Sequence, residues 1–235
     1  ALNFLIEEPD RSLLVANDFP GVKKIKANLA PGSQPGTTQV EAQVEEGRLV
    51  TGSVWADNYG NHYTGSGRLS VAANLNSPTG YGDLWTLTAS KSSGMTSGRF
   101  GAIVPVGSRG GRVGASYSEV SMDFAGQVIP VNLDGKARVA SVFASYPLHR
   151  SATSNVLLSG SYDAKSLQHN IEGSTDSDRQ ISLFTLGLLG DGLDRFVGTY
   201  SWNLSLASGS ADLSGNAANA LRDNIGARTD GHFTK

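Results

Sequence analysis

The stretch RLSVAANL at residues 68–75 sets apolar side chains against small or polar ones at every second position. That alternation is the pattern of a β-strand whose two faces meet different surroundings. The stretch RFVGTYSWNLSL at residues 195–206 does the same, and similar units of about ten residues recur from residue 48 to residue 235, separated by bursts of Gly, Asn, Asp or Ser. Strands of globular proteins usually have ~5–6 residues, whereas ~9–11 are needed to cross a bilayer at a tilt. The repeated length therefore favours a membrane β-barrel.

Nine long strands and the beginning of a tenth can be placed from this pattern. They are 48–58, 65–76, 82–91, 97–106, 111–121, 136–147, 155–165, 179–190 and 195–207, with the tenth beginning near Thr229. The connections at 76–83 and 106–111 read as tight turns, and those at 122–135, 166–178 and 208–228 as longer loops, as in outer-membrane barrels. Residues 181–189 are apolar on both faces, so that strand either packs against something inside the lumen or has a different register.

The bulk composition excludes several classes of protein. Nineteen basic and 21 acidic residues leave a net charge of −2, so no nucleic-acid partner is expected. The absence of cysteine excludes a disulfide framework and thiolate metal sites. No run of 18 apolar residues predicts a membrane-spanning helix, and residues 1–8 lack the basic start of a signal peptide.

The first 46 residues differ from the rest. Residues 8–18 predict a helix, because Pro9 suits a first helical position and residues 19–21 (FPG) stop it. Residues 23–29 and 38–45 then alternate as two strands around a Pro/Gly-rich turn. A helix followed by a hairpin is the end of a small α+β module, too small to bury a core alone. We therefore expect the chain to start within a module.

These readings give the expected fold class: mainly β, with residues 47–235 as the N-terminal half of an antiparallel transmembrane β-barrel and residues 1–46 as the end of the α+β module. Ten strands with open edges would leave backbone groups unpaired in lipid. Further strands are therefore expected to close the barrel, and an open sheet is expected for this chain.

Seven motifs in order along almost the whole chain resemble the outer-membrane transporters of two-partner secretion, which export and activate haemolysins and filamentous adhesins. The first two, DRSLLVANDFPGV at 10–22 and PGSQPGT at 31–37, resemble the second periplasmic POTRA module of that family. The others are GSVWADNYGNHYTG (52–65), NLNSPTGYGD (74–83), SYPL (145–148), DLSGNAA (212–218) and ARTDGHFTK (227–235).

The resemblance implies a sixteen-stranded barrel behind two POTRA modules, in the outer membrane of a Gram-negative bacterium with the modules in the periplasm. Its partners would be a secreted exoprotein, such as a haemolysin or adhesin, and outer-membrane lipid. The unfolded exoprotein would add a strand to the module's exposed edge at residues 23–29. The candidate substrate-binding residues are Leu13, Leu14, Lys24, Lys26 and Asn28. A core role is favoured for Leu13, Leu14, Ile25, Ala27 and Leu29, with substrate contact through the backbone and Lys24 or Lys26.

The alternation itself divides the barrel residues into two sets. The small polar side chains expected to line the lumen are Ser70, Ala72, Asn74, Thr86, Thr88, Ser116, Ser118, Ser159, Ser161, Thr199, Ser201 and Asn203. The apolar side chains expected to face lipid are Leu69, Val71, Tyr117, Leu158, Tyr162, Tyr200 and Trp202.

No catalytic or cofactor site is expected. His62, His149, His169 and His232 fall in or near predicted loops without ligand spacing, and no nucleophile motif accompanies them. Residues 176–178 (DSD) could hold Ca²⁺ weakly but are better explained as a flexible surface loop. Two alternatives to a secretion transporter stay open: a passive porin, and a secreted β-sandwich that acts as an adhesin or carbohydrate-binding module.

Overall fold

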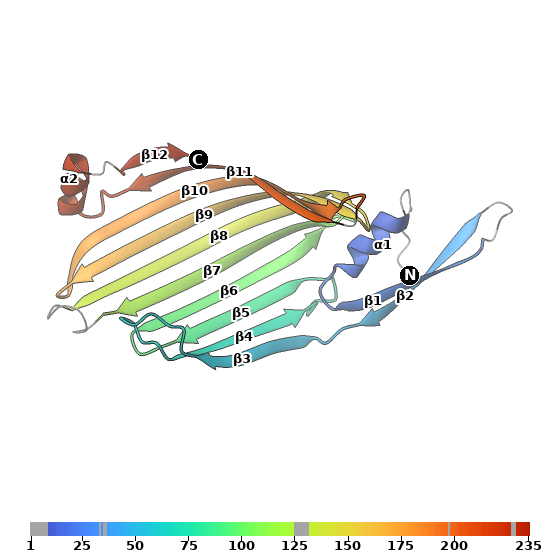
Figure 1. Cartoon of the computed structure of the whole chain (residues 1–235), viewed down its shortest axis with the longest axis horizontal. Helices are drawn as coiled ribbons and strands as arrows, with labels where there is room; N and C mark the ends of the chain where they lie inside the picture. Colours follow the sequence, from blue (N-terminus) through green and yellow to red (C-terminus); the bar gives the residue numbers. More distant parts are fainter. Residues whose placement is uncertain (1–8, 33, 35–36, 125–131, 197, 227–228) are drawn as a thin grey trace.

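One antiparallel sheet dominates the molecule. The computed structural model describes residues 9–32, 34, 37–124, 132–196, 198–226 and 229–235. Ten strands follow each other in the order β12-β11-β10-β9-β8-β7-β6-β5-β4-β3, so every neighbour in space is a neighbour in sequence (Figure 1). Since β3 and β12 do not pair with each other, the sheet is open. The fold class expected from the sequence is confirmed, and a two-sheet sandwich is wrong.

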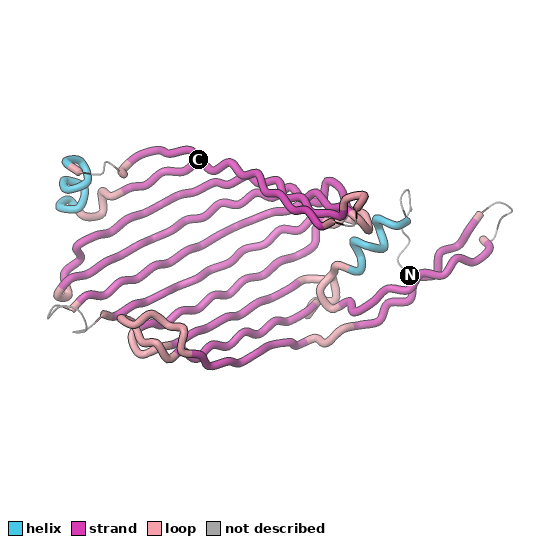
Figure 2. Tube along the Cα trace, viewed as in Figure 1, coloured by secondary structure: helices cyan, strands magenta, loops and turns pink. Residues whose placement is uncertain are grey.

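The strands of this sheet agree in number with the ten that the sequence predicts. They are β3 Val50–Asp57, β4 Arg68–Asn76, β5 Leu84–Lys91, β6 Met95–Val106, β7 Gly111–Asp123, β8 Leu133–Arg150, β9 Ser154–Ile171, β10 Ser174–Leu193, β11 Thr199–Asp212 and β12 Gly231–Thr234. A second sheet holds β1 Val22–Pro31 and β2 Thr38–Glu46, which follow helix α1 Pro9–Asn17. Helix α2 Ala217–Ile225 lies between β11 and β12. Figure 2 shows the two helices at opposite ends of the large sheet, with α1 beside the β1–β2 hairpin.

The predicted loop at 166–178 is wrong. Strand β9 continues to Ile171 and β10 starts at Ser174, and Glu172 (φ 50°) and Gly173 (φ 75°) form the turn between them. Two consecutive residues with positive φ define the tight hairpin turn that matches strand twist. Strands β9 and β10 are 18 and 20 residues long, whereas ~9–11 residues suffice to cross a membrane. The sequence pattern that predicts a membrane-crossing strand therefore ends near residue 166, although the strands themselves continue.

Residues 176–178 belong to this extension and do not form a loop. A register shift between Thr175 and Ser177 places Asp176 at a β-bulge inside β10. Within the described residues, no three His, Asp or Glu side chains are grouped so that they could hold a metal ion.

One face of the large sheet is apolar. A single row of paired residues crosses seven strands on this face: Leu75, Trp85, Ala102, Ala115, Val142, Tyr162 and Phe184. Val142 is 55% and Phe184 is 52% exposed. The large apolar side chains that are buried in the described part are Val15 and Leu213, and neither belongs to the large sheet. Such a continuous exposed apolar surface needs an apolar medium.

None of the described helices has both the length and the hydropathy to cross a membrane.

Adjacent substitutions in the middle of β5 test this two-faced arrangement. Leu87 lies on the apolar face, opposite Ala73 and Phe100, and Thr88 is an exposed residue on the other face. In the full-length protein, Leu87→Arg should lower the free energy of unfolding by about 2–4 kcal/mol in lipid vesicles, because a charge near the bilayer midplane is costly. Thr88→Arg should change it by less than about 1 kcal/mol on the same argument. Urea titrations of tryptophan fluorescence measure both, and equal losses would contradict a lipid-facing surface.

Candidate functional site

The face opposite the apolar one carries all twelve residues expected to line the lumen. Asn74 pairs with Thr86, Ser116 pairs with Gly101 and Ser141, and Ser161 pairs with Thr185. The same register places the other eight on this inner face: Ser70, Ala72, Thr88, Ser118, Ser159, Thr199, Ser201 and Asn203. The residues expected to face lipid fall on the opposite, outer face. That the inner face lines a lumen remains a prediction.

Many hydroxyl groups of the inner face are bonded within the wall. Ser70 Oγ lies 2.9 Å from Ser90 Oγ, and Arg99 donates to Ser116 Oγ over 3.2 Å. Ser159 Oγ donates to the carbonyl of Gly187 over 3.4 Å. Hydroxyls that already have partners offer an extended chain few strong contacts. Ser70 is only 4% exposed, so it contributes little to the accessible surface.

Residues 181–189 of β10 are apolar on both faces, and the register between β9 and β10 is continuous over these residues. Ile181 pairs with Lys165 and Leu183 with Asp163, which places both apolar side chains on the inner face. Of the two explanations left open by the sequence, an altered register is therefore wrong.

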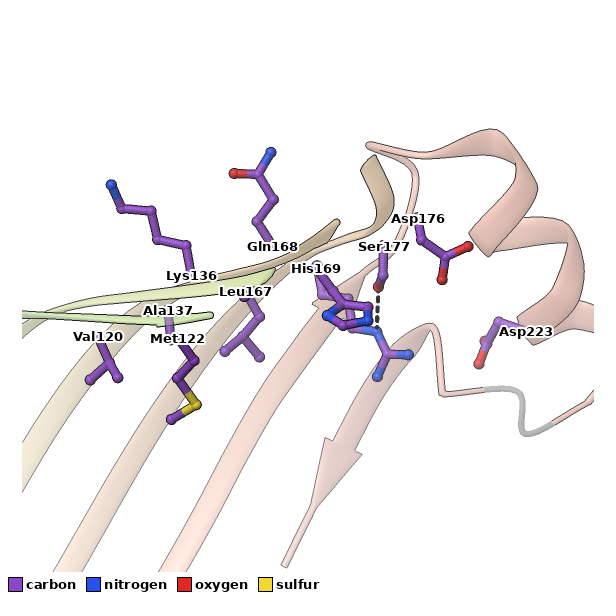
Figure 3. A pocket seen from close by; sticks show the side chains of 12 residues that line it. Val120, Met122, Lys136, Ala137, Leu167, Gln168, His169, Asp176, Ser177 and Asp223 are labelled. Carbon is purple, nitrogen blue, oxygen red and sulfur yellow. Dashed lines mark hydrogen bonds between the residues drawn. The ribbon is translucent and has the colours of Figure 1, made fainter. Parts of the chain in front are cut away.

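The far end of the inner face, away from α1, is hollowed. The hollow has a volume of about 630 Å³ and is bounded by β7 to β10 and by Asp223 of α2. In Figure 3, Val120, Met122 and Leu167 point to one side of the sheet, and Lys136 and Gln168 point to the other. His169, predicted in a loop, lies in β9 and lines this hollow.

Residues 213–226 and 229–230 beside the hollow are arranged around Asp223, where the sequence predicts only a loop. The Thr229 hydroxyl donates to Asp223 Oδ1 over 2.6 Å and the Asp230 N–H to Oδ2 over 3.0 Å. The Thr229 hydrogen bonds are the main reason that the pKa of Asp223 lies below its usual value. Asn216 directly before Ala217 is a favoured N-cap residue, the signal by which α2 could have been found.

At the near end of the sheet, arginine side chains join α1 and the residues after it to the strand ends. Arg150, the last residue of β8, donates to both carboxylate oxygens of Asp18, over 2.9 and 3.0 Å. Arg112 donates to the Asp18 carbonyl over 2.9 Å. Arg11 of α1 donates to the Pro147 carbonyl over 2.7 Å. Bidentate Arg–carboxylate pairs fix orientation as well as contributing energy.

Two turns of the sheet touch this junction closely. A Cβ on Gly110 would lie 2.9 Å from Val15 Cγ1 and 3.0 Å from Pro147 Cγ. A Cβ on Gly82 would lie 3.1 Å from Phe19 Cγ. Residues from the motifs at 10–22, 74–83 and 145–148 thus meet at one place, which we call the rim junction: Arg11, Val15, Asp18, Phe19, Gly82, Gly110, Arg112, Pro147 and Arg150.

The candidate substrate-binding residues lie beside the rim junction, on α1 and β1. Leu13 and Leu14 of α1 are partly exposed, and Lys24, Lys26 and Asn28 of β1 are exposed. In the described residues β1 pairs only with β2. The expected core role is wrong for Ala27, which is exposed, and for Leu29, which is 75% exposed, because α1 packs beside the start of β1 and does not extend over its end.

The comparisons with known proteins agree with this architecture. The family model "Haemolysin secretion/activation protein ShlB/FhaC/HecB" matches residues 36–234. The chain is 24% identical over 203 residues to the Heme/hemopexin transporter protein HuxB of Haemophilus influenzae strain 86-028NP, covering 85% of this chain and 34% of the relative. It is 22% identical, with the same coverage, to HuxB of strain KW20. The chain therefore spans about a third of the length of these curated relatives.

Two solved structures are similar in fold. CdiB from Escherichia coli aligns with a TM-score of 0.73 at 21% identity, over 87% of this chain and 39% of that chain. CdiB from Acinetobacter baumannii aligns with a TM-score of 0.64 at 18% identity, over 81% and 40%.

The chain is thus a β-barrel-type outer-membrane polypeptide of the two-partner secretion class. It belongs to the ShlB/FhaC/HecB family of haemolysin secretion/activation proteins, and the resemblance seen in its motifs is confirmed.

Gly110 and Gly107 in one turn provide a matched test of the rim junction. Both have positive φ (84° and 72°), but a Cβ on Gly107 would meet nothing within 4 Å. Each change to Ala should cost about 1 kcal/mol of backbone strain. Gly110→Ala should cost a further 1–3 kcal/mol, roughly, by pushing against Val15. Hydrogen exchange of the α1 amides in the full-length protein should rise only in Gly110→Ala, and a rise in both would contradict close packing at Gly110.

The turn at 77–83 provides a pH test. Burial alone would raise the pKa of Asp83, but hydrogen bonds from the Thr79 hydroxyl (2.6 Å) and N–H (3.2 Å) and the Trp85 indole (2.9 Å) hold it below its usual value. A carboxyl whose pKa is lower in the folded state than in the unfolded state stabilises the fold above its unfolded pKa of about 3.9. That stabilisation is lost as the pH falls through the pKa of the folded state. Trp85 fluorescence, in a variant with Trp55 and Trp202 changed to Phe, should therefore shift only below about pH 4. Asp83→Ala should abolish the shift, and a shift with unchanged midpoint in that variant would contradict the assignment.

Proposed function

We propose that the full-length protein exports a large secreted protein across the outer membrane. In this proposal the sheet forms part of the wall of a conduit, and the helix–hairpin module receives the unfolded substrate in the periplasm. The observation that supports the proposal is the two-faced sheet: its outer face is apolar, and its inner face carries small polar side chains on most strands, with β10 apolar on both faces. Family membership supports secretion as the purpose of that face.

The β1 edge is the proposed entry point. An extended substrate would add a strand there through main-chain hydrogen bonds, which need no strict sequence match. Lys24, Lys26 and Asn28 alternate along one face of β1 and would contact the substrate's side chains. Leu13 and Leu14 would border the groove beside this edge. Folding of the exported protein outside the cell would make the transfer directional without a nucleotide.

The exported protein is proposed to be a large exoprotein such as a haemolysin or a filamentous adhesin. The family description names haemolysin secretion and activation, and the HuxB relatives are heme/hemopexin transporters by name. A passive porin would share the two-faced sheet, but the rim junction would then have no purpose. The arginine contacts that hold α1 at the strand ends therefore favour a secretion transporter over a porin.

Single cysteines, placed at adjacent positions that point to opposite faces of the sheet, test the conduit directly. Since this chain contains no cysteine, single cysteines can replace Ser116, Ser161 or Thr199 on the inner face, and Tyr117, Tyr162 or Tyr200 as matched controls on the outer face. The full-length protein, free of other cysteines, is expressed together with its secreted partner. The partner carries one cysteine in an extended segment, and a folded domain fused to its C-terminus stalls its export. Oxidation should link the partner to the three inner positions at least tenfold more than to the three outer ones. Equal linking at both sets would contradict the proposal.

A further inference from the structure

Three paired polar residues lie side by side at the near end of the inner face. Arg150, the last residue of β8, pairs with Asn155 of β9, and Asn155 pairs with Asp191 of β10. Arg150 Nη1 donates to Asn155 Oδ1 over 2.8 Å, and Asn155 Nδ2 donates to Asp191 Oδ2 over 2.8 Å. We call Arg150, Asn155 and Asp191 the rim row, because side-chain hydrogen bonds join them from one strand to the next.

A β-bulge brings Arg150 into the rim row. The register of β8 and β9 shifts between Pro147 and His149, with Leu148 as the extra residue. Pro147 lies on the inner face, so strict alternation along β8 would turn Arg150 outward, and the extra residue turns it inward instead. Proline is tolerated at a bulge because it has no N–H to donate to the sheet. The bulge in the motif at 145–148 therefore determines the face on which Arg150 lies.

The rim row directs Arg150 toward Asp18, the first residue after α1. Nε and Nη2 of Arg150 donate to the Asp18 carboxylate, while Nη1 is held by Asn155 and by the Ser151 carbonyl, over 3.1 Å. A guanidinium is planar and rigid, so holding Nη1 fixes the direction of the other two nitrogens. Asp18 follows the negative end of the α1 dipole, where a carboxylate is unfavourable. Its position is therefore explained by Arg150 and not by the helix.

The end of α1 joins two surfaces. Asn17, the last residue of α1, accepts a hydrogen bond from the Ile25 N–H of β1 over 3.2 Å. The next residue, Asp18, binds Arg150 on the inner face. Adjacent residues thus connect α1 to the proposed entry strand β1 and to the proposed wall of the conduit. The direction of Arg150 consequently sets how β1 lies relative to the inner face.

We propose that Asn155 and Asp191 are positioning residues for the transfer of the exported chain from β1 to the inner face. Asp191 fixes the Asn155 amide with its oxygen toward Arg150. Asn155 in turn fixes the guanidinium that holds Asp18, and with it the end of α1. Neither positioning residue has to contact the exported chain. The inference rests on the proposed function, since that transfer is part of it.

The test measures secretion of the partner protein and the position of the helix–hairpin module in the same full-length variants. Spin labels at Glu41 of β2 and at Ser108 in the β6–β7 turn, both exposed, report that position through the distribution of distances between them. Asp191→Ala should broaden the distribution and lower secretion about fivefold, the effect of one hydrogen bond of ordinary net strength. Asp191→Asn keeps an oxygen that can accept from Asn155, so it should restore both readouts to within about twofold of the unaltered protein.

Asn155→Ala tests whether the two residues act in series. It should have the same effect as Asp191→Ala, and the double variant should lose no more than either single one, because the bond from Asp191 acts only through Asn155. The matched control is Asp163→Ala, which removes an inner-face carboxylate of β9 that lies near Lys165, far along the strand from Arg150. The control should leave secretion and the distance distribution unchanged. Resistance to SDS at room temperature shows which variants are folded, and Asn155→Ala replaces Asp191→Ala if the latter is not.

Two results would overturn the proposal. The first is unchanged secretion and an unchanged distance distribution in folded Asp191→Ala or Asn155→Ala. The second is an equal loss in Asp163→Ala, which would show that removal of any inner-face carboxylate has this effect. Failure of the unaltered protein to secrete its partner would instead contradict the proposed function, so the two failures are distinguishable.

Discussion

Backbone hydrogen bonding is the constraint on which the rest of this structure depends. In hydrocarbon each unpaired N–H or C=O costs several kcal/mol, roughly, so a chain can cross only if its strands satisfy one another. The large sheet does this through nine consecutive antiparallel pairs, and the register stays continuous through most of their length. Continuous register forces alternate side chains to opposite faces over the whole sheet. The apolar outer face, the polar inner face and the absence of large buried apolar side chains from the described part of the sheet all follow from that geometry.

The rim junction attaches helix α1 to one end of the large sheet. Its contacts join residues far apart in the chain: the Asp18 carboxylate and Arg150 are 132 positions apart, and Arg11 and Pro147 are 136 apart. They are polar bonds to the ends of strands, and Val15 and Pro147 add buried apolar side chains. Such a junction holds the orientation of α1 without a large apolar interface. This holds α1, beside the β1–β2 hairpin, at one end of the large sheet, as the proposed transfer of a substrate from β1 to the inner face requires.

Strand number, strand order and the membership of each face could be predicted because alternation is a local property of the sequence. Prediction failed beyond the apolar outer surface: residues 174–178 are polar throughout, and residues 166–171 carry only Leu167 and Ile171 among polar side chains, so their pattern does not reveal that β9 and β10 continue as a hairpin. Leu29 was misplaced because alternation identifies a face of β1 and not how far α1 covers it. The hydrogen bonds of Asp18 and Asp223 could not be predicted either, since their partners come together only in three dimensions. Three of the motifs nevertheless contain residues of the rim junction: Val15 and Asp18 at 10–22, Gly82 at 74–83 and Pro147 at 145–148.

The most direct test of this account is an accessibility scan of spin labels at consecutive positions 156–163 of β9 in the full-length protein, reconstituted in lipid. Labels at 157, 159, 161 and 163, on the inner face, should collide with a water-soluble nickel chelate. Labels at 156, 158, 160 and 162 should collide with oxygen dissolved in the bilayer. A two-residue period in both signals, with opposite phase, is the predicted result. Nickel accessibility at all eight positions would contradict it, because the outer face would then be in water and the sheet could not be the wall of a membrane conduit.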